Sequence, residues 1–405
     1  MPPLCLVHGT RVVPLEVGPT TRLTFADPRE RRDLGGRRVA VTVRADRVEI
    51  EDESGDGVSV RGERKRRHVV GPGEAVAVGR QRVLIAESVG SGARSAVLWN
   101  GMIAAEPCSL EALCELARVG PARAPVWIAG ESGTGKELAA RAIHETSGRA
   151  GRPFVAVNCA ALPDNLLEAE LFGVERGAFT GATRTRAGAF QRAAGGTLLL
   201  DELGELPPSA QAKILRALET QEVQPVGAER TIKVDVRVIA ASWRDLEHEV
   251  EAGRFRLDLL HRLWVLKVEL PPLRARTGDI APLIDHLLRL EGAPDLAPSA
   301  AMIERLARHT WPGNIRELRN CVARAVAAED PSALAPQVRR EARPVDGTQH
   351  PRVELAHQAL DRHLGNRTRS AASLGVSRST FYRWLDASRG PAPRDVVPAS
   401  MTSAR

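Results

Sequence analysis

Residues 124–144, APVWIAGESGTGKELAARAIH, constrain the fold of this chain more than any other stretch. An apolar run from Val126 to Ala129 leads into a glycine-rich turn, and a helical pattern of apolar residues follows it. In the turn, the spacing G-x-x-x-x-G-K from Gly130 to Lys136 lets successive backbone N–H groups surround a phosphate while the lysine reaches its outer oxygens. We therefore predict a strand, a phosphate-binding loop and a helix, the beginning of an α/β domain.

A second apolar run ends in two carboxylates. The stretch GGTLLLDELGEL predicts a strand from Thr197 to Leu200, which is followed directly by Asp201 and Glu202. A P-loop ATPase needs one carboxylate close to Mg²⁺ and another that polarises the attacking water. Two unrelated surface carboxylates are the alternative. The combination with the phosphate loop favours an enzyme that binds ATP and Mg²⁺.

The candidate nucleotide contacts are the residues of the loop, its lysine and the residue after it. Glu137 occupies the position at which the general pattern has a serine or threonine that ligates magnesium, so the chain departs from that pattern there. The full set of candidate contacts from this stretch is Gly130, Glu131, Ser132, Gly133, Thr134, Gly135, Lys136 and Glu137.

Changes in the apolar pattern divide the chain into segments. Between residues 22 and 87, short alternating runs are separated by Gly, Asp and Pro, which is typical of a small β-sandwich. From residue 98 onward strand and helix patterns alternate, which predicts an α/β domain with a largely parallel sheet. The predicted fold is therefore multidomain, with a β-rich domain at 1–97, an α/β domain at 98–328, a linker at 329–351, a three-helix domain at 352–389 and a flexible tail at 390–405.

Composition bears on the partners and the compartment. Lys and Arg exceed Asp and Glu by 57 − 50 = 7, which favours an anionic partner such as nucleic acid but equally fits a soluble basic protein. No stretch approaches the roughly 18 consecutive apolar residues of a membrane span. The five cysteines have neither a C-x-x-C pair nor a metal-ligand spacing, so we expect reduced thiols. These features predict a cytoplasmic protein without a membrane partner.

Several motifs together resemble one family. They are GESGTGKE, FVAVNCAAL, ELFGVERGAFTGA, GGTLLLDELGEL, VDVRVIAASWRDL, FRLDLLHRLWVLKVELPPLRAR and WPGNIRELRN. Over residues 101–328 they look like the AAA+ domain of the sigma-54-dependent transcriptional activators, of which GAFTGA is nearly diagnostic. The resemblance implies an AAA+ P-loop ATPase with a helical lid, which remodels the sigma-54 RNA polymerase holoenzyme and promotes open-complex formation. It also implies a homo-oligomer, expected to be a hexameric ring.

The resemblance implies roles for single residues of the ATP site. Asp201 matches the Mg²⁺ carboxylate of the family, and Glu202 matches its catalytic base. Asn158 matches the asparagine that restrains that glutamate, and the alternative is an asparagine that bonds the loop backbone. Arg316 matches the arginine of the lid that contacts nucleotide in the same subunit.

Arg256 and Arg262 match two arginines that the family presents to the ATP of a neighbouring subunit. A guanidinium at the γ-phosphate stabilises charge that spreads in the transition state. Six residues correspond to a rotation of about 240° on a regular α-helix, so the two side chains cannot point the same way. We therefore expect Arg262 to be the finger and Arg256 to have a structural role.

The GAFTGA motif places a phenylalanine in a loop without helical or strand periodicity. In the family that it resembles, the tip of this loop contacts sigma-54. Glycines at both ends permit backbone movement, and a phenyl ring offers an apolar anchor for a partner. The alternative is a phenylalanine that packs into its own subunit. The candidate sigma-54 contacts are Gly177, Ala178, Phe179, Thr180, Gly181 and Ala182.

One departure from the family leaves a second function open. Ser242 and Trp243 stand where members usually have a Thr-Asn pair, and an indole can donate a hydrogen bond but cannot accept one. This change alters the usual link between the ATP site and the loop. The alternative function is therefore a DNA-binding repressor or scaffold whose AAA+ domain is not coupled to sigma-54 remodelling.

The β-rich segment has its own resemblance. The stretches DESGDGVSVRG and GPGEAVAVGRQRVLI look like parts of a forkhead-associated (FHA) domain, with Asp56-Gly57 in place of the Asn-Gly turn of that family. The signatures by which FHA domains hold phosphothreonine are missing. A regulatory interaction module, a spacer and an oligomerisation domain all stay open.

The last helical segments have helix-turn-helix spacing, with sharp turns at Gly365 and Gly375. They look like the Fis-type motif, which implies that the third helix enters the major groove of double-stranded DNA at an upstream enhancer-like site. A three-helix cap on the ATPase is the alternative. The candidate DNA contacts are Arg378, Ser379, Thr380, Tyr382 and Arg383.

Overall fold

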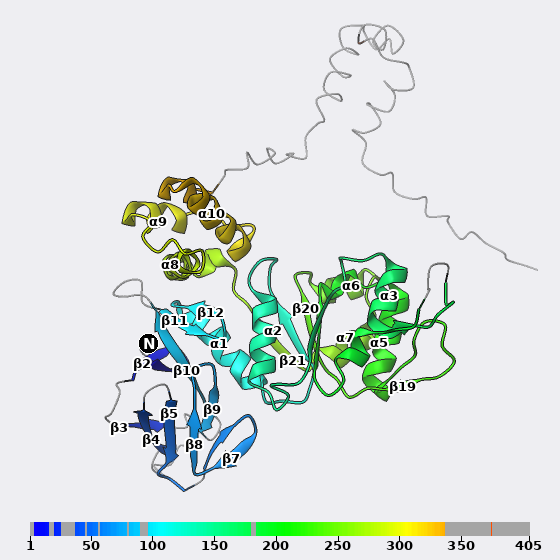
Figure 1. Cartoon of the computed structure of the whole chain (residues 1–405), viewed down its shortest axis with the longest axis horizontal. Helices are drawn as coiled ribbons and strands as arrows, with labels where there is room; N and C mark the ends of the chain where they lie inside the picture. Colours follow the sequence, from blue (N-terminus) through cyan, green and yellow to red (C-terminus); the bar gives the residue numbers. More distant parts are fainter. Residues whose placement is uncertain are drawn as a thin grey trace, which may run out of the picture. The chain divides into compact units, whose positions relative to one another are not determined.

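The computed structural model divides the chain into two units, Met1–Pro336 and Gln337–Arg405 (Figure 1). The described residues are 4–15, 20–25, 37–44, 47–55, 57–78, 81–89, 96–179, 184–336 and 374. Apart from residue 374, the predicted helix-turn-helix, with the five DNA contacts assigned to it, therefore lies outside them, as do Thr180, Gly181 and Ala182 of the GAFTGA loop. Within the described ranges, no helix is long and apolar enough to cross a membrane.

The N-terminal part consists of two antiparallel sheets. One sheet runs in the order β12-β11-β10-β9-β6-β7, with β1 on β10 and β2 on β1, and the other runs β3-β4-β5-β8. Their bounds are β1 Leu4–His8, β2 Arg11–Pro14, β3 Thr20–Phe25, β4 Arg37–Arg44, β5 Arg47–Asp52, β6 Val58–Val60, β7 Glu63–Lys65, β8 Arg67–Val70, β9 Ala75–Val78, β10 Gln81–Val89, β11 Ala96–Trp99 and β12 Met102–Ala104. The prediction of a strand-rich N-terminal region is confirmed.

Alternation along these strands places apolar side chains of both sheets in one cluster. Val41 and Ile50 come from the smaller sheet, and Val58 and Val76 come from the larger one. All four are at most 2% exposed. Since successive residues of a strand point to opposite faces, the valine-rich alternation seen in the sequence is enough to bury one face of each sheet.

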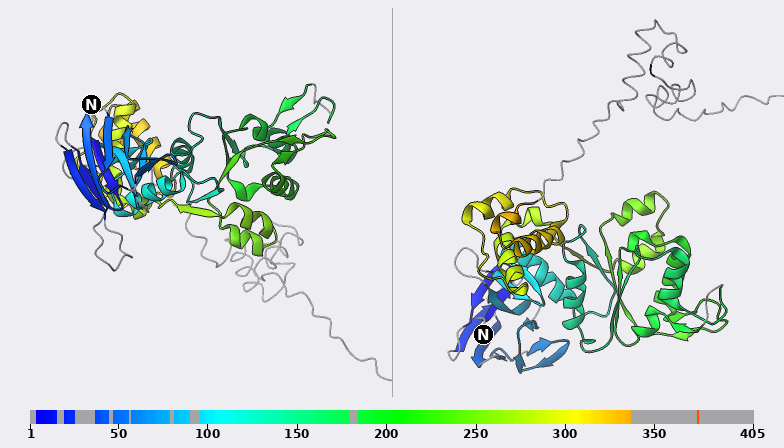
Figure 2. Two further views of the ribbon diagram at one scale, coloured as in Figure 1. Left: turned by 90° about the horizontal axis from the view of Figure 1, so that it is seen from below. Right: turned by 45° about the horizontal axis from the view of Figure 1, so that its top comes forward.

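The larger sheet continues past residue 97 to Ala104 through the β11–β12 hairpin. One face of this hairpin, with Trp99 and Met102, shares a cluster with helix α1 (Pro107–Val119). The other face, with Ala96 and Ile103, shares a cluster with the helices near the end of the described chain. Figure 2 shows the blue strands beside the yellow helices in both views.

The middle of the chain forms a five-stranded parallel sheet in the order β14-β17-β20-β13-β21, as predicted. The strands are β13 Val126–Ala129, β14 Phe154–Asn158, β17 Thr197–Asp201, β20 Arg237–Ser242 and β21 Leu266–Glu269. Every residue of β20 is buried, as expected for a strand covered on both faces. The helices are α1, α2 Lys136–Glu145, α3 Asp164–Phe172, α4 Ala189–Arg192, α5 Pro208–Thr220, α6 Leu246–Glu251 and α7 Leu257–Leu263.

Three helices, α8 Ile280–Leu290, α9 Ala300–Ala307 and α10 Asn314–Ala328, form the predicted lid. Their core surrounds the fully buried Trp311, whose Nε1 donates to the Leu306 carbonyl at 2.9 Å. The first residues of the segment predicted as a linker belong to this core as well. Asp330 caps the short 3-10 helix η5 (Pro331–Leu334), and Leu334 is fully buried. An apolar residue at the sixth position of this polar segment is therefore enough to hold its start on the lid.

Candidate active site

The phosphate loop joins β13 to α2, as the sequence predicts, and three of its residues have a positive φ: Gly130 (156°), Gly133 (79°) and Gly135 (104°). Glycine adopts these angles without strain. Gly133 has a second reason to be glycine, because a Cβ atom there would lie 2.3 Å from the Gly313 carbonyl oxygen. Glu137 points away from this loop and pairs with Arg141 at 3.0 Å on the exposed side of α2.

Lys136, the cation of the loop, is buried, with 6% of its surface exposed. Its Nζ donates to the carbonyl oxygens of Gly130 and Glu131 at 3.0 and 3.3 Å and lies 3.9 Å from a carboxylate oxygen of Glu202. Burial lowers the pKa of Lys136, while the carboxylates of Glu202 and Asp201 oppose that shift. The ammonium group is therefore held at the mouth of the loop by groups that a phosphate can replace.

Glu202 follows β17 in a left-handed conformation, with φ at 54° and ψ at 48°. One of its carboxylate oxygens, Oε2, is buried and has no hydrogen-bond partner among the residues that the structure describes. Burial raises the pKa of Glu202, and Lys136 and the backbone amide of Trp243 act in the opposite direction. A non-glycine residue in this region and an unpartnered buried oxygen are both costly, and such features concentrate at functional sites.

Asp201 and Asn158 lie side by side, because β14 and β17 are paired in register at these two residues. An oxygen of Asp201 accepts the backbone N–H of Glu202 at 3.0 Å. The side-chain oxygen of Asn158 accepts the N–H of Ala160 at 2.9 Å. The asparagine is thus at the expected end of its strand, and its oxygen serves the loop backbone in this conformation.

The lid holds four consecutive residues of the loop. Arg274 binds both carboxylate oxygens of Glu131, at 2.5 and 2.7 Å. Asn314 donates to Glu131 and to the Ser132 carbonyl, and Arg316 donates to the Ser132 hydroxyl at 2.8 Å. The last two contacts are the backbone N–H of Ile315 to the Gly133 carbonyl and Arg276 to the Thr134 carbonyl, both at 3.0 Å.

Of these lid residues, sequence reasoning found Arg316 but missed Arg274, Arg276 and Asn314. The latter three lie within PPLRAR and WPGN, two motifs that the sequence analysis quoted without assigning their residues. Asn314 carried a further signal, since it directly follows a Pro-Gly pair and asparagine tolerates the left-handed conformation that it adopts here, with φ at 50°.

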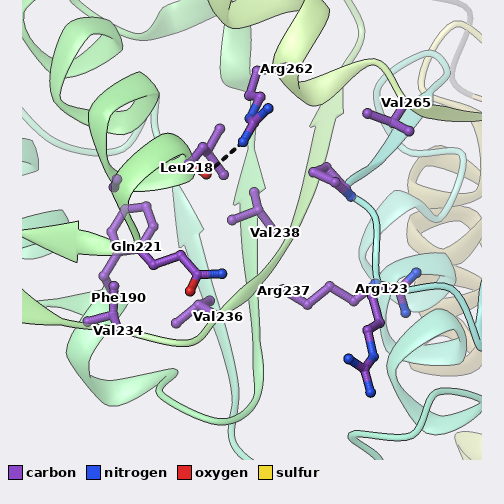
Figure 3. A pocket seen from close by; sticks show the side chains of 12 residues that line it. Arg123, Phe190, Leu218, Gln221, Val234, Val236, Arg237, Val238, Arg262 and Val265 are labelled. Atoms are coloured by element: carbon purple, nitrogen blue, oxygen red, sulfur yellow. Dashed lines mark hydrogen bonds between the residues drawn. The ribbon is translucent and has the colours of Figure 1, made fainter.

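The two finger candidates separate. Arg256 precedes α7 and pairs with Asp258 at 2.7 Å, whereas Arg262 lies in the last turn of that helix. Arg262 lines a pocket together with Arg123, Arg237 and Val265, which lie before or at the first residues of β13, β20 and β21 (Figure 3). It therefore lies at the amino edge of the sheet, whereas the phosphate loop and Glu202 lie at the carboxyl edge. A five-residue strand separates the two edges by roughly 16 Å.

The described part of the GAFTGA loop extends from a short ladder, β15 Gly173–Val174 with β16 Arg186–Ala187. Gly177 has a φ of 86°, and Phe179 is 37% exposed. Ala178 packs so closely on Gly227 that a Cβ added to this glycine would lie 2.5 Å from the Cβ of Ala178. The described residues thus place Phe179 at the surface and fix the stem of the loop.

Trp243, the departure noted in the sequence, follows β20 and is 53% exposed. The Arg244 guanidinium lies 5.4 Å from the centre of its ring and forms an ion pair with Glu205 at 2.5 Å. The contact between Trp243 and Glu202 therefore uses the backbone of Trp243, while its indole faces Arg244.

A parallel sheet with a glycine-rich phosphate loop, an acidic pair at the same edge and a three-helix lid defines an AAA+ ATPase. The comparison with family models agrees and is more specific. Residues 102–269 match the sigma-54 interaction domain, residues 274–343 match the AAA+ ATPase lid domain, and residues 355–387 match the bacterial regulatory proteins of the Fis family.

Known proteins share this organisation. The transcriptional regulatory protein ZraR of Salmonella typhimurium is 46% identical over 308 residues, which are 70% of this chain and 68% of ZraR. The regulatory protein AtoC of Escherichia coli is 44% identical over 327 residues, 74% of this chain and 69% of AtoC. The chain belongs to the family of sigma-54-dependent transcriptional activators.

A solved structure supports the same assignment. The crystal structure of NtrX from Brucella abortus in complex with ATP aligns with a TM-score of 0.54 and 34% identity, over 71% of this chain and 68% of NtrX. The chain is thus an AAA+ ATPase of this family.

Proposed function

We propose that this protein binds DNA upstream of a promoter and uses ATP hydrolysis to remodel sigma-54 RNA polymerase until the open complex forms. The observation that carries the proposal is that one domain, matched as a sigma-54 interaction domain, contains both the phosphate loop beside Glu202 and the exposed Phe179 of the GAFTGA loop. The Fis-type match at residues 355–387 supports the proposed DNA binding. The proposed contacts are Arg378, Ser379, Thr380, Tyr382 and Arg383.

ATP would bind with its phosphates on the backbone N–H groups of residues 130–136 and on Lys136. The carbonyl contacts of Lys136 leave its ammonium group at the mouth of the loop. There it can exchange these carbonyls for the β- and γ-phosphate oxygens as hydrogen-bond partners. Arg316 bonds the Ser132 hydroxyl across the same loop, so a small rotation brings its guanidinium to the nucleotide.

Asp201 and Glu202 fit a magnesium ion that is shared with the phosphates. Magnesium in such sites uses one or two carboxylates together with substrate oxygens, so no larger protein cage is needed. Among the described residues no cluster of three or more metal-ligating side chains is found. When bound, the ion would neutralise charge on the β- and γ-phosphates. Asp201 would hold it.

Glu202 would accept the proton of the attacking water. Its unpartnered oxygen Oε2 is free to take a hydrogen bond, and its raised pKa suits a base better than that of a fully solvated carboxylate. Asn158, at the same edge, would restrain this carboxylate by turning its amide toward it.

The ATP site would be completed by Arg262 of a second copy, with Arg256 fixed in a structural role by its pair with Asp258. Arg262 lies at the edge of the sheet opposite the loop of its own chain, too far to reach that ATP. A head-to-tail contact, in which the amino edge of one copy meets the carboxyl edge of the next, closes into a ring when the rotations between successive copies add up to one full turn. We propose a hexamer in the cytoplasm, where the DNA and the polymerase are.

For the N-terminal sheets we propose a sandwich with an FHA-like regulatory role, supported by the apolar cluster that both sheets share.

The rival function, a repressor or scaffold without sigma-54 coupling, is favoured by one observation, the exposed Trp243 in place of a polar sensing residue. ATP turnover and sigma-54-dependent transcription, measured with the same preparation, separate the two functions. Turnover without transcription at a promoter that the protein binds would favour the rival.

Phe179 offers the sharpest test of the sigma-54 contact. Phe179→Ala should leave stability and ATP turnover nearly unchanged, because the ring is 37% exposed, and should abolish sigma-54 binding and transcription. Phe190→Ala is the matched control, since that ring is 1% exposed and stacks on Phe172, so its loss should cost about 3–5 kcal/mol. A sharp fall in melting temperature for Phe179→Ala, or unchanged transcription, would contradict the proposed sigma-54 contact. Thr180→Ala, in the part of the loop outside the described residues, should behave as Phe179→Ala does.

A further inference from the structure

One of the lid contacts to the phosphate loop differs from the others in its surroundings. Arg276 is 3% exposed, and its guanidinium donates to the carbonyl oxygen of Thr134, itself fully buried. Because the C=O and N–H of a peptide unit point in opposite directions, a bond to this carbonyl leaves the N–H of Gly135, in the same peptide unit, available to phosphate. Arg276 therefore fixes the orientation of the loop from the side away from the nucleotide.

Asp279 holds Arg276 in turn. The carboxylate is fully buried, one of its oxygens lies 3.9 Å from Arg276, and it accepts the backbone N–H groups of Ala105 and Glu106 at 2.7 and 2.9 Å. It also accepts the hydroxyl of Ser109. A buried ion pair persists only when further hydrogen bonds satisfy it, so these three donors are part of what keeps Arg276 in place.

Two of the donors, Ala105 and Glu106, directly follow β12, and the third, Ser109, lies in the first turn of α1. Glu106 makes a second bond to the same segment, since its carboxylate accepts the N–H of Gly278, the neighbour of Asp279, at 2.9 Å. The hairpin that ends at Ala104 lies between two apolar cores. Trp99 and Met102 share one core with α1, and Ile103 shares the other with Leu273 and Ile280. A displacement of the N-terminal sheet cannot leave the donors to Asp279 where they are.

We propose that Arg276 and Asp279 are positioning residues that make the grip of the phosphate loop on ATP depend on how the β11–β12 hairpin of the N-terminal sheet is docked. The inference rests on the proposed ATP site and assigns its regulation. A signal received by the N-terminal sheets would then reach the nucleotide through four steps: hairpin, Asp279, Arg276, Thr134.

The first test measures ATP affinity and steady-state turnover of the full chain with Arg276→Lys, Arg276→Met and Asp279→Asn. We expect the dissociation constant and KM for ATP to rise about 2- to 30-fold, with a smaller change in kcat, because the loop loses its orientation and not its chemistry. Arg276→Lys, which keeps the charge beside Asp279, should restore part of the affinity that Arg276→Met loses. Asp295→Asn, an exposed lid carboxylate, is the matched control and should change nothing.

The second test asks whether the hairpin acts through this pair. Ile103→Ala should weaken ATP binding in the wild-type chain, and the same substitution should have little further effect when Arg276 is already Met, since the connection is then broken. If Ile103→Ala does not fold, Ser109→Ala removes one hydroxyl from Asp279 and loosens the same contact more gently.

The outcomes separate cleanly. A wild-type chain that does not bind ATP overturns the proposed ATP site itself. Normal ATP binding by the wild type and by folded Arg276 and Asp279 variants alike overturns only the positioning role. Additive effects of Ile103→Ala and Arg276→Met would show that the hairpin reaches the loop by another route, which also contradicts the proposal.

Discussion

The two edges of the parallel sheet are built in different ways. At the carboxyl edge the phosphate loop is held by many contacts, because four of its residues are bonded by the lid and Lys136 bonds two carbonyls. At the amino edge Arg262 is exposed beside an open pocket, with one long bond of 3.4 Å to the Leu218 carbonyl. One edge has a phosphate loop fixed by many contacts, and the other carries an exposed cation with a single long bond to its own chain. The difference supports a site that two copies build together.

Removing the exposed cation should have the largest effect. We expect Arg262→Ala to bind nucleotide normally and to lose roughly 10³- to 10⁵-fold in turnover, because transition-state charge on the phosphate is no longer compensated. Arg256→Ala is the contrast, since that side chain is paired with Asp258, and its turnover should fall much less.

Mixing experiments decide whether Arg262 acts on a neighbour. Arg262→Ala chains mixed with Lys136→Ala chains should regain some activity, because an intact loop can then meet an intact arginine across one boundary. The absence of rescue at every ratio, with mixed rings shown to form, would contradict action across a subunit boundary and would make the two edges independent.

At the carboxyl edge, Glu202→Gln should keep ATP binding and lose about 10²- to 10⁴-fold in turnover, since the amide keeps the shape of the side chain and cannot accept a proton. Binding is measured by titration with a slowly hydrolysed analogue and turnover by phosphate release. Asp201→Asn, in contrast, should also weaken the dependence of binding on magnesium. Wild-type turnover in Glu202→Gln would remove this residue from the base role.

The pH dependence of turnover sharpens the same assignment. Burial raises the pKa of Glu202 above 4.5, the value for an unshifted glutamate. Protonation should switch the base off, so turnover should fall about tenfold per pH unit below this raised pKa. A raised carboxyl pKa in the folded state stabilises the fold at low pH, and that contribution is lost as pH rises through the folded pKa. The loss of rate in acid should therefore precede any unfolding that circular dichroism detects. A rate that stays constant down to pH 4.5 would contradict the assignment.

The smallest effect is expected at Trp243. Trp243→Asn should change turnover by no more than about two- to fivefold, because the contact with Glu202 comes from the backbone and the indole contributes only a surface interaction with Arg244 of about 0.5–1 kcal/mol. A much larger change in turnover, in either direction, would mean that the indole itself takes part in coupling.

Local patterns in the sequence predicted the elements of the site well. The strand from Val126 to Ala129 has the expected bounds, and the strand that carries Asp201 was placed to within one residue. These predictions succeed because strand, glycine turn and helix are adjacent in the chain, and short-range physics decides all three. The parallel order of the strands follows from the alternation of strands with helices.

Contacts over long sequence separations could not be predicted in this way. Arg276 bonds a carbonyl 142 positions earlier, and Asp279 accepts N–H groups more than 170 positions earlier. Nothing in the local pattern of an arginine or an aspartate states which distant backbone group it will meet. The hairpin β11–β12 escaped notice for a similar reason, because two short strands near the predicted boundary at residue 97 resemble the start of the following domain as much as the end of the preceding one.

The same hairpin limits how such proteins can be recombined. A chain cut after residue 97 would divide β11, remove its pairing with β10 and leave only Leu98 and Trp99 to pair with β12. Trp99 and Met102, now at most 8% exposed, would lose the β10 side chains of their core and lie next to unpaired backbone groups. An unprotected strand edge beside apolar side chains invites pairing with other chains. Chimeras that exchange the sensing part of this protein for another should therefore join after Ala104, or should carry the hairpin over with the ATPase together with strand β10, which covers it.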